Sequence, residues 1–100
     1  MSYSQQLSEL RRMIILRHLA DDANTTRSSN VVILQATANG LNVRSPRAQV
    51  LADLNFLADL ALVTTEAKGD FVLVEATDAG VDVGKGLASI DGIANPRSIS

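Results

Sequence analysis

The stretch that most constrains the fold lies between residues 42 and 63, where a polar turn leads into a Ser-Pro pair and a helical pattern of apolar residues. Ser45 can cap the free amides of a first helical turn, and Pro46 suits the first helical position because no N–H is needed there. The apolar residues that follow recur at spacings of three and four: Val50, Leu54, Leu57 and Ala61. This spacing predicts a helix with one buried face.

The residues before this turn predict another helix over residues 31–39. Ser28, Ser29 or Asn30 can cap it, and Gly40 is expected to end it because glycine tolerates the left-handed conformation. A helix, a glycine-containing turn and a second capped helix form a helix-turn-helix. The chain is therefore expected to carry this motif from residue 31 into the stretch at residues 42–63.

A first helix is predicted over residues 5–21, with a polar loop following it to residue 30. Two apolar stripes run along this helix, one of Leu7, Leu10 and Ile14 and the other of Ile15, Leu16 and Leu19. A surface helix of a monomer needs only one such stripe. The second stripe indicates either a homodimer through this helix and the C-terminal segment, or cover from the C-terminal segment of the same chain.

The second half of the chain indicates a hairpin and a short helix. Strands are expected at residues 62–66 and 71–75, joined by a turn that contains Gly69. Thr77 can cap a last helix from Asp78 to about Leu87, in which three glycines require docking for stability. Beyond it, Ile90 and Ile93 are expected to anchor an extended segment with frayed final residues. Residues 1–88 are thus expected to form one domain and residues 89–100 an extended C-terminal tail.

Composition argues against catalysis and against a metal site. The chain has 100 residues, which suits one domain, and it has no cysteine and one histidine, His18. A zinc site would need several such ligands. Residues 84–86 (GKG) lack the first glycine and the hydroxyl residue of a phosphate-binding loop. No apolar run is long enough to span a membrane. We therefore expect a cytoplasmic protein that is not an enzyme, needs no cofactor and does not bind a membrane.

Charge is divided unevenly along the chain. Residues 1–50 carry six arginines against three acidic residues, whereas residues 51–100 carry three basic residues against eight acidic ones. Nucleic-acid affinity depends largely on basic side chains that replace counterions on phosphates. Only the first half of the chain can therefore supply a basic patch, and that patch is a modest one.

The segment LADLALV at residues 57–63, the hairpin, and EATDAG at residues 75–80 resemble winged-helix regulators of the MarR and ArsR type. In those families the same stretch runs from the recognition helix through the wing to the last helix. They usually carry glycine at the position of Ala61 and leucine at the position of Ala76. The resemblance implies an α+β, mainly α, winged helix-turn-helix fold with three helices, a two-stranded wing, a short C-terminal helix and a tail.

Nearly the whole chain is similar to small proteins of Mu-like phages and prophages, whose ending resembles GVDVGKG at residues 80–86 followed by GIANP at residues 92–96. Their genes tend to lie near those for DNA packaging. The similarity implies a regulatory or DNA-packaging accessory role in the cytoplasm of a bacterial host.

Residues around the predicted third helix are the candidate contacts with double-stranded DNA. Arginines at its start can hold phosphates or a guanine edge, glutamine and asparagine amides can pair with adenine, and alanine can contact a thymine methyl. A lysine in the hairpin turn can reach a neighbouring groove. The candidate DNA-binding residues are Arg44, Ser45, Arg47, Ala48, Gln49 and Lys68.

An alternative is a protein-interaction module on the same scaffold, without DNA binding. Ala48, Ala52 and Phe56 follow one another at four-residue intervals, and an exposed apolar stripe of this kind can dock another helix. Ala52 and Phe56 are therefore candidate contacts with a phage or host protein. The outward face of this helix carries no lysine or arginine, so both hypotheses stay open.

Overall fold

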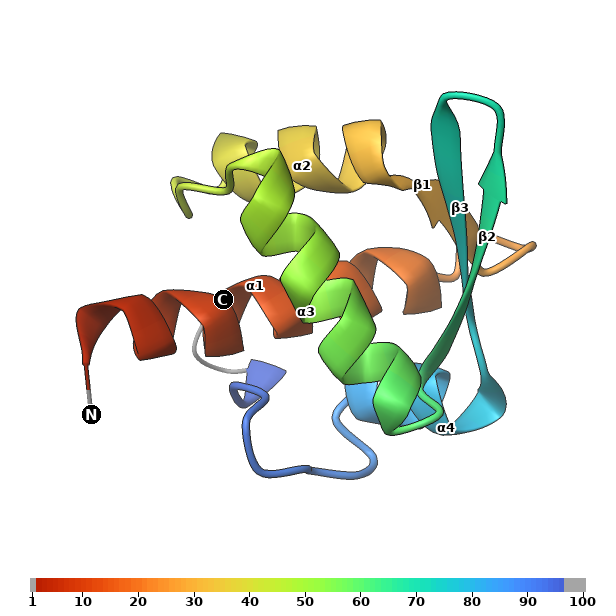
Figure 1. Ribbon diagram of the computed structural model, residues 1–100. Helices are drawn as coiled ribbons and strands as arrows, with labels where there is room; N and C mark the ends of the chain where they lie inside the picture. Colours follow the sequence, from red (N-terminus) through yellow and green to blue (C-terminus); the bar gives the residue numbers. More distant parts are fainter. Residues whose placement is uncertain (1, 97–100) are drawn as a thin grey trace.

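The computed structural model describes residues 2–96. In this part of the chain, four helices and three strands build an α+β fold, which confirms the expected mainly helical class (Figure 1). The elements are α1 (Tyr3–Ala20), β1 (Ser28–Asn30), α2 (Val31–Gly40), α3 (Arg47–Asp59), β2 (Val63–Lys68), β3 (Phe71–Ala76) and α4 (Asp78–Gly84). The strands form an antiparallel sheet in the order β1-β3-β2.

Strand β1 lies inside the segment that was expected to be a loop. Its residues Ser28, Ser29 and Asn30 are paired with Glu75, Val74 and Leu73 of β3. Three polar residues show no alternating pattern that would predict a strand. Strand β1 exists because β3 offers it a free edge, and its last residue then caps α2, with the Asn30 side chain accepting a hydrogen bond from the amide of Ile33 at 2.9 Å.

The predicted hairpin is confirmed, with a tighter turn than expected. Lys68 is paired directly with Phe71, so only Gly69 and Asp70 connect the two strands. Gly69 has a φ of +59°, which glycine adopts without steric cost. In Figure 1 the hairpin projects beside α2 and α3.

Helix α1 is the centre of the core, and both of its apolar stripes are covered within the chain. Ile15, Leu16 and Leu19 are buried in the main cluster with residues of α2, α3, the sheet and α4. On the other stripe, Ile14 packs with Ala38 and Val43, and Leu7 and Leu10 lie partly buried against them. The end of α2 and the turn after it therefore cover this stripe, so the homodimer prediction loses the exposed surface on which it depended.

Three helices end in the same hydrogen-bonded motif, in which one residue adopts a left-handed conformation. After α2 this residue is Asn42, with a φ of 64°, and after α4 it is Gly86, with a φ of 78°. The prediction that Gly40 ends α2 in a left-handed conformation is wrong, because Gly40 is the last helical residue and Asn42 makes the reversal. The last helix also ends earlier than expected, at Gly84, because Gly86 reverses the chain.

The motif after α3 places an alanine where glycine is preferred. The amide of Leu62 donates to the carbonyl of Leu57 at 2.9 Å, the amide of Ala61 donates to that of Ala58 at 2.9 Å, and Ala61 has a φ of 56°. A left-handed conformation costs a non-glycine residue about 1–2 kcal/mol. The prediction that Ala61 points into the core is wrong, because this residue is exposed and lies beyond the end of α3.

Ala61→Gly is expected to stabilise the fold by about 0.5–1 kcal/mol, since relief of the strained φ exceeds the added entropy of the unfolded chain. The melting temperature should rise by about 4 °C in thermal unfolding followed by circular dichroism. Gly69→Ala is the matched control, because it puts a Cβ on a positive φ and should lower the melting temperature. A lower melting temperature for Ala61→Gly would show that the positive φ of Ala61 is not strained.

Helix α4 is short but docks closely on the rest of the fold. The Thr77 hydroxyl caps it by accepting from the amide of Gly80 at 3.1 Å, and it donates to the carbonyl of Ala61 at 2.7 Å. A Cβ at Gly84 would lie 2.5 Å from the carbonyl oxygen of Leu16. The glycines that weaken this helix in isolation therefore permit its contact with α1 and with the end of α3.

The segment after α4 runs back along α1. Ile93 is buried in the main cluster, and Ile90 packs against it partly buried, which confirms that these two residues anchor the segment. The amide of Ala94 donates to the carbonyl of Glu9 at 3.1 Å. The final residues that were expected to fray, 97–100, lie outside the described part of the chain.

Candidate functional site

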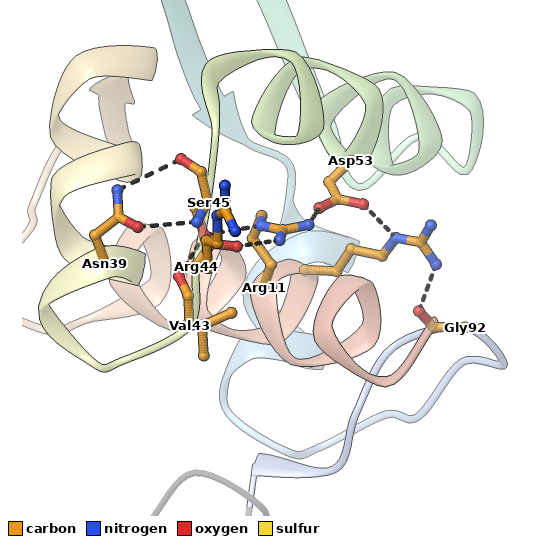
Figure 2. A network of polar contacts seen from close by, with 8 residues as sticks. Arg11, Asn39, Val43, Arg44, Ser45, Asp53 and Gly92 are labelled. Atoms are coloured by element: carbon orange, nitrogen blue, oxygen red, sulfur yellow. Dashed lines mark hydrogen bonds and ion pairs between the residues drawn. The ribbon is translucent and has the colours of Figure 1, made fainter. Parts of the chain in front are cut away.

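A buried arginine of α1 holds the turn between α2 and α3. Arg11 is 2% exposed. Its guanidinium donates to the Ser45 hydroxyl (2.8 Å), to the Asp53 carboxylate (2.8 Å) and to the carbonyl of Arg44 (2.6 Å). Figure 2 shows these bonds joining α1 to α3 and to the turn that precedes α3. One side chain thus sets the position of the turn and of α3 relative to α1.

The carboxylate of Asp53 is shared between two arginines. It accepts from Arg11 through one oxygen and from Arg12 through the other, at 3.0 Å. Arg12 also donates to the carbonyl of Gly92 at 2.8 Å, so the same network holds the C-terminal segment (Figure 2). This network was not predicted from the sequence, where both arginines were counted toward a basic surface. The available signal was an acidic residue at position 53, on the predicted buried face of the helix.

Ser45 lies inside this network and does not cap α3. It is 1% exposed, and its hydroxyl accepts from Arg11 and donates to the carbonyl of Val43 at 2.7 Å. Pro46 occupies the N-cap position, where no side-chain hydrogen bond is formed. The prediction that Ser45 caps α3 is therefore wrong, because the Ser45 hydroxyl oxygen accepts a hydrogen bond from the buried Arg11 guanidinium. The backbone of Ser45 is held as well, since its amide donates to Asn39 at 2.9 Å.

The other candidate DNA-binding residues lie at the surface. Arg44 is exposed in the turn, Arg47 begins the helix, and Ala48 and Gln49 follow as exposed residues. Lys68 is exposed at the end of β2, next to the tip of the hairpin. The structure therefore keeps these five residues accessible and places Ser45 behind them.

Phe56 does not continue the surface stripe of Ala48 and Ala52. The guanidinium carbon of Arg12 lies 3.8 Å from the centre of its ring, a cation–π contact. The C-terminal segment approaches so closely that a Cβ at Gly92 would lie 2.7 Å from the ring. Phe56 is half-buried beneath these groups, and the exposed part of the proposed partner surface consists of two alanines.

Ion pairing leaves few basic side chains free. Besides Arg11 and Arg12, Arg27 pairs with Asp78, and Lys85 pairs with Asp22. Within residues 2–96, the basic residues without an ion pair are Arg17, Arg44, Arg47 and Lys68. Three of these four, Arg44, Arg47 and Lys68, belong to the predicted DNA-binding residues.

Neither a cluster of metal ligands nor a membrane-spanning helix occurs in the part of the chain that the structure describes. No group of three or more histidine, cysteine or acidic residues there is arranged to hold a metal ion. None of its helices has the length and apolar character needed to cross a membrane.

Fold and site together define a small α+β protein in which a buried Arg-Asp network presents a turn and a helix at the surface. The chain is 36% identical over 91 residues to the "Uncharacterized protein gp26" of Escherichia phage Mu, and the match covers 91% of this chain and 92% of that protein. The chain therefore belongs to the family of this phage Mu protein, which confirms the expected similarity to Mu-like phages. No protein-family model matches the chain. No solved structure matches it either.

Proposed function

We propose that the chain is a winged helix-turn-helix protein that binds double-stranded DNA through α3 and the β2–β3 hairpin. Two features of the fold support this assignment. Helix α2, the turn at residues 41–46 and helix α3 follow one another as in a helix-turn-helix. The hairpin that follows pairs with β1 and projects beside α3 as a wing (Figure 1).

The observation that carries the proposal is the set of unpaired cations at this surface. Arg44 and Arg47 flank the start of α3, which has no side-chain cap, and Lys68 lies at the hairpin end. Free amides at a helix start and nearby arginines favour phosphate. Arg11 donates to the carbonyl of Arg44 and so holds the turn in place. The Arg44 side chain remains exposed.

Acidic residues limit the size of the contact. Asp59 ends α3, while Glu66 and Asp70 lie close to Lys68 along the hairpin. Asp59 repels a phosphate backbone at the C-terminal end of α3, and Glu66 and Asp70 weaken the attraction of Lys68, so the contact is limited to the start of α3 and the single lysine of the hairpin. Three phosphate contacts give a slope of log affinity against log salt of about −3, which means a loss of about 40-fold between 50 and 200 mM salt.

The proposed role is regulation or assistance in DNA packaging, without catalysis, in the cytoplasm of a bacterial host. The three contacts are those of a monomer, since the chain itself covers both apolar stripes of α1; the predicted homodimer through α1 and the C-terminal segment would about double the salt slope. We do not propose the protein-interaction module as a second function, because Phe56, its main residue, is held by Arg12 and the C-terminal segment.

Arg44→Ala and Arg47→Ala are each expected to reduce the salt slope by about 1 and to weaken binding to all sequences alike, since each removes one phosphate contact. Fluorescence anisotropy with a duplex of about 30 base pairs, three helical turns, measures both quantities. Light scattering on the same samples measures the mass.

Arg17→Ala is the matched control, because Arg17 is also exposed and unpaired but lies on α1. Its removal should leave the slope unchanged. Equal reductions of the salt slope by all three substitutions would mean that affinity depends only on the net charge of the protein. Absence of binding at low salt would refute DNA binding itself.

A further inference from the structure

We infer that the exposed face of α3 reads A·T base pairs in the major groove, an inference that rests on the proposed DNA binding. Ala48, Gln49, Ala52 and Asn55 are all exposed, and spacings of three, four and seven residues place them on one side of the helix. Within the described residues, the side-chain amides of Gln49 and Asn55 make no hydrogen bond. Both amides are therefore free to pair with a ligand.

The chemistry of this face matches adenine and thymine. The amide of glutamine or asparagine can accept from adenine N6 and donate to N7, while a methyl side chain packs on the thymine methyl. Guanine is usually read by arginine or lysine, and cytosine by a carboxylate. Between residues 48 and 55 the exposed side carries none of these charged residues, so it lacks the groups that would favour G·C pairs.

Size and rigidity favour the same contact. Ala48 and Ala52 are small, so the helix surface between Gln49 and Asn55 can approach the base edges closely. The opposite side of α3 is held by Val50, Leu54 and Leu57, which are fully buried, and by the ion pairs of Asp53. The reading face therefore has a fixed position, which specificity requires.

Arginines at the start of α3 are assigned to phosphates and not to bases. Arg44 precedes the helix, and Arg47 is its first residue, so both lie at one end of the reading face. The salt dependence of their alanine variants tests this assignment separately. Base preference then depends on Gln49 and Asn55.

The experiment compares three duplexes with identical flanks and a central block of A·T, G·C or inosine·cytosine pairs. An inosine·cytosine pair presents the minor groove of A·T but the major groove of G·C. Anisotropy at low salt should show binding to the A·T duplex at least about fivefold tighter than to the other two, the lower limit for one amide–adenine contact. Replacing thymine by uracil, which lacks the methyl group, should also weaken binding.

Gln49→Ala should reduce the preference for A·T without changing the salt slope, and Gln49→Arg should shift it toward G·C. Gln49 is exposed, so the fold should persist in both variants, as circular dichroism will show. Equal binding to all three duplexes would overturn the A·T inference and leave DNA binding intact. Inosine·cytosine binding as tight as A·T would overturn it in favour of minor-groove or shape recognition. No binding to any duplex would overturn both proposals.

Discussion

Asp53→Ala is expected to lower the free energy of unfolding by about 3–5 kcal/mol, because it leaves the buried Arg11 guanidinium without its counterion. Both side chains are almost completely buried, at 3% and 2% exposure, so water cannot replace the lost carboxylate. The same substitution releases Arg12, which holds the C-terminal segment at Gly92. The free energy of unfolding of a domain is about 5–15 kcal/mol in total, so this substitution would remove a large part of it.

Chemical denaturation of the variant and the unmodified protein measures this loss. Asp59→Ala is the matched control, since it removes an exposed carboxylate from the same helix and should change stability by less than about 0.5 kcal/mol. Asp53→Asn keeps the side-chain size and one acceptor oxygen, so its effect should fall between the two. A loss for Asp53→Ala no larger than that of the control would show that the network does not hold α3.

Gly80→Ala is expected to destabilise the fold by about 2–3 kcal/mol, the upper part of the range caused by overpacking. An added Cβ would clash with the carbonyl oxygen of Leu62, which is backbone and cannot rotate away. The amide of Thr77 donates to this same carbonyl at 3.0 Å, so moving it would also disturb the start of α4. The melting temperature should fall by about 10 °C.

Gly40→Ala tests the same chemical change at an open site. A Cβ at Gly40 would meet no atom within 4 Å, and its φ is not positive, so alanine should stabilise the end of α2 by up to about 1 kcal/mol. In thermal unfolding, Gly80→Ala should therefore lower the melting temperature and Gly40→Ala should raise it. A neutral Gly80→Ala would mean that α4 is not docked as closely as the structure shows.

Local patterns were sufficient where a residue's neighbours in the chain decide its conformation. The spacing of Val50, Leu54 and Leu57 predicted the buried face of α3, and all three are fully buried. Thr77 was expected to cap the last helix, and it does so. The hairpin followed from β-branched and aromatic residues on either side of Gly69. In each case the relevant partner lies within a few residues.

Local patterns failed where the partner comes from a distant part of the chain. Ser45 has the residue type of a helix cap, but Arg11 lies 34 positions earlier and takes its hydroxyl oxygen. Phe56 has the spacing of an exposed stripe, but Arg12 covers its ring. For the candidate site, the positions of Arg44, Arg47 and Lys68 at the surface agree with expectation, whereas the network behind them was not predicted.

Residues 42–63 thus predicted by themselves that a turn leads into a helix with one apolar face, because helical periodicity and turn chemistry are properties of adjacent residues. Only the tertiary structure decided which polar residues lie inside. Arg11 and Asp53 are 42 positions apart, and their pairing needs α1 and α3 to be packed together first. Asp53 neutralises Arg11 and Arg12, so Arg44 and Arg47 remain as the unpaired arginines at the start of α3.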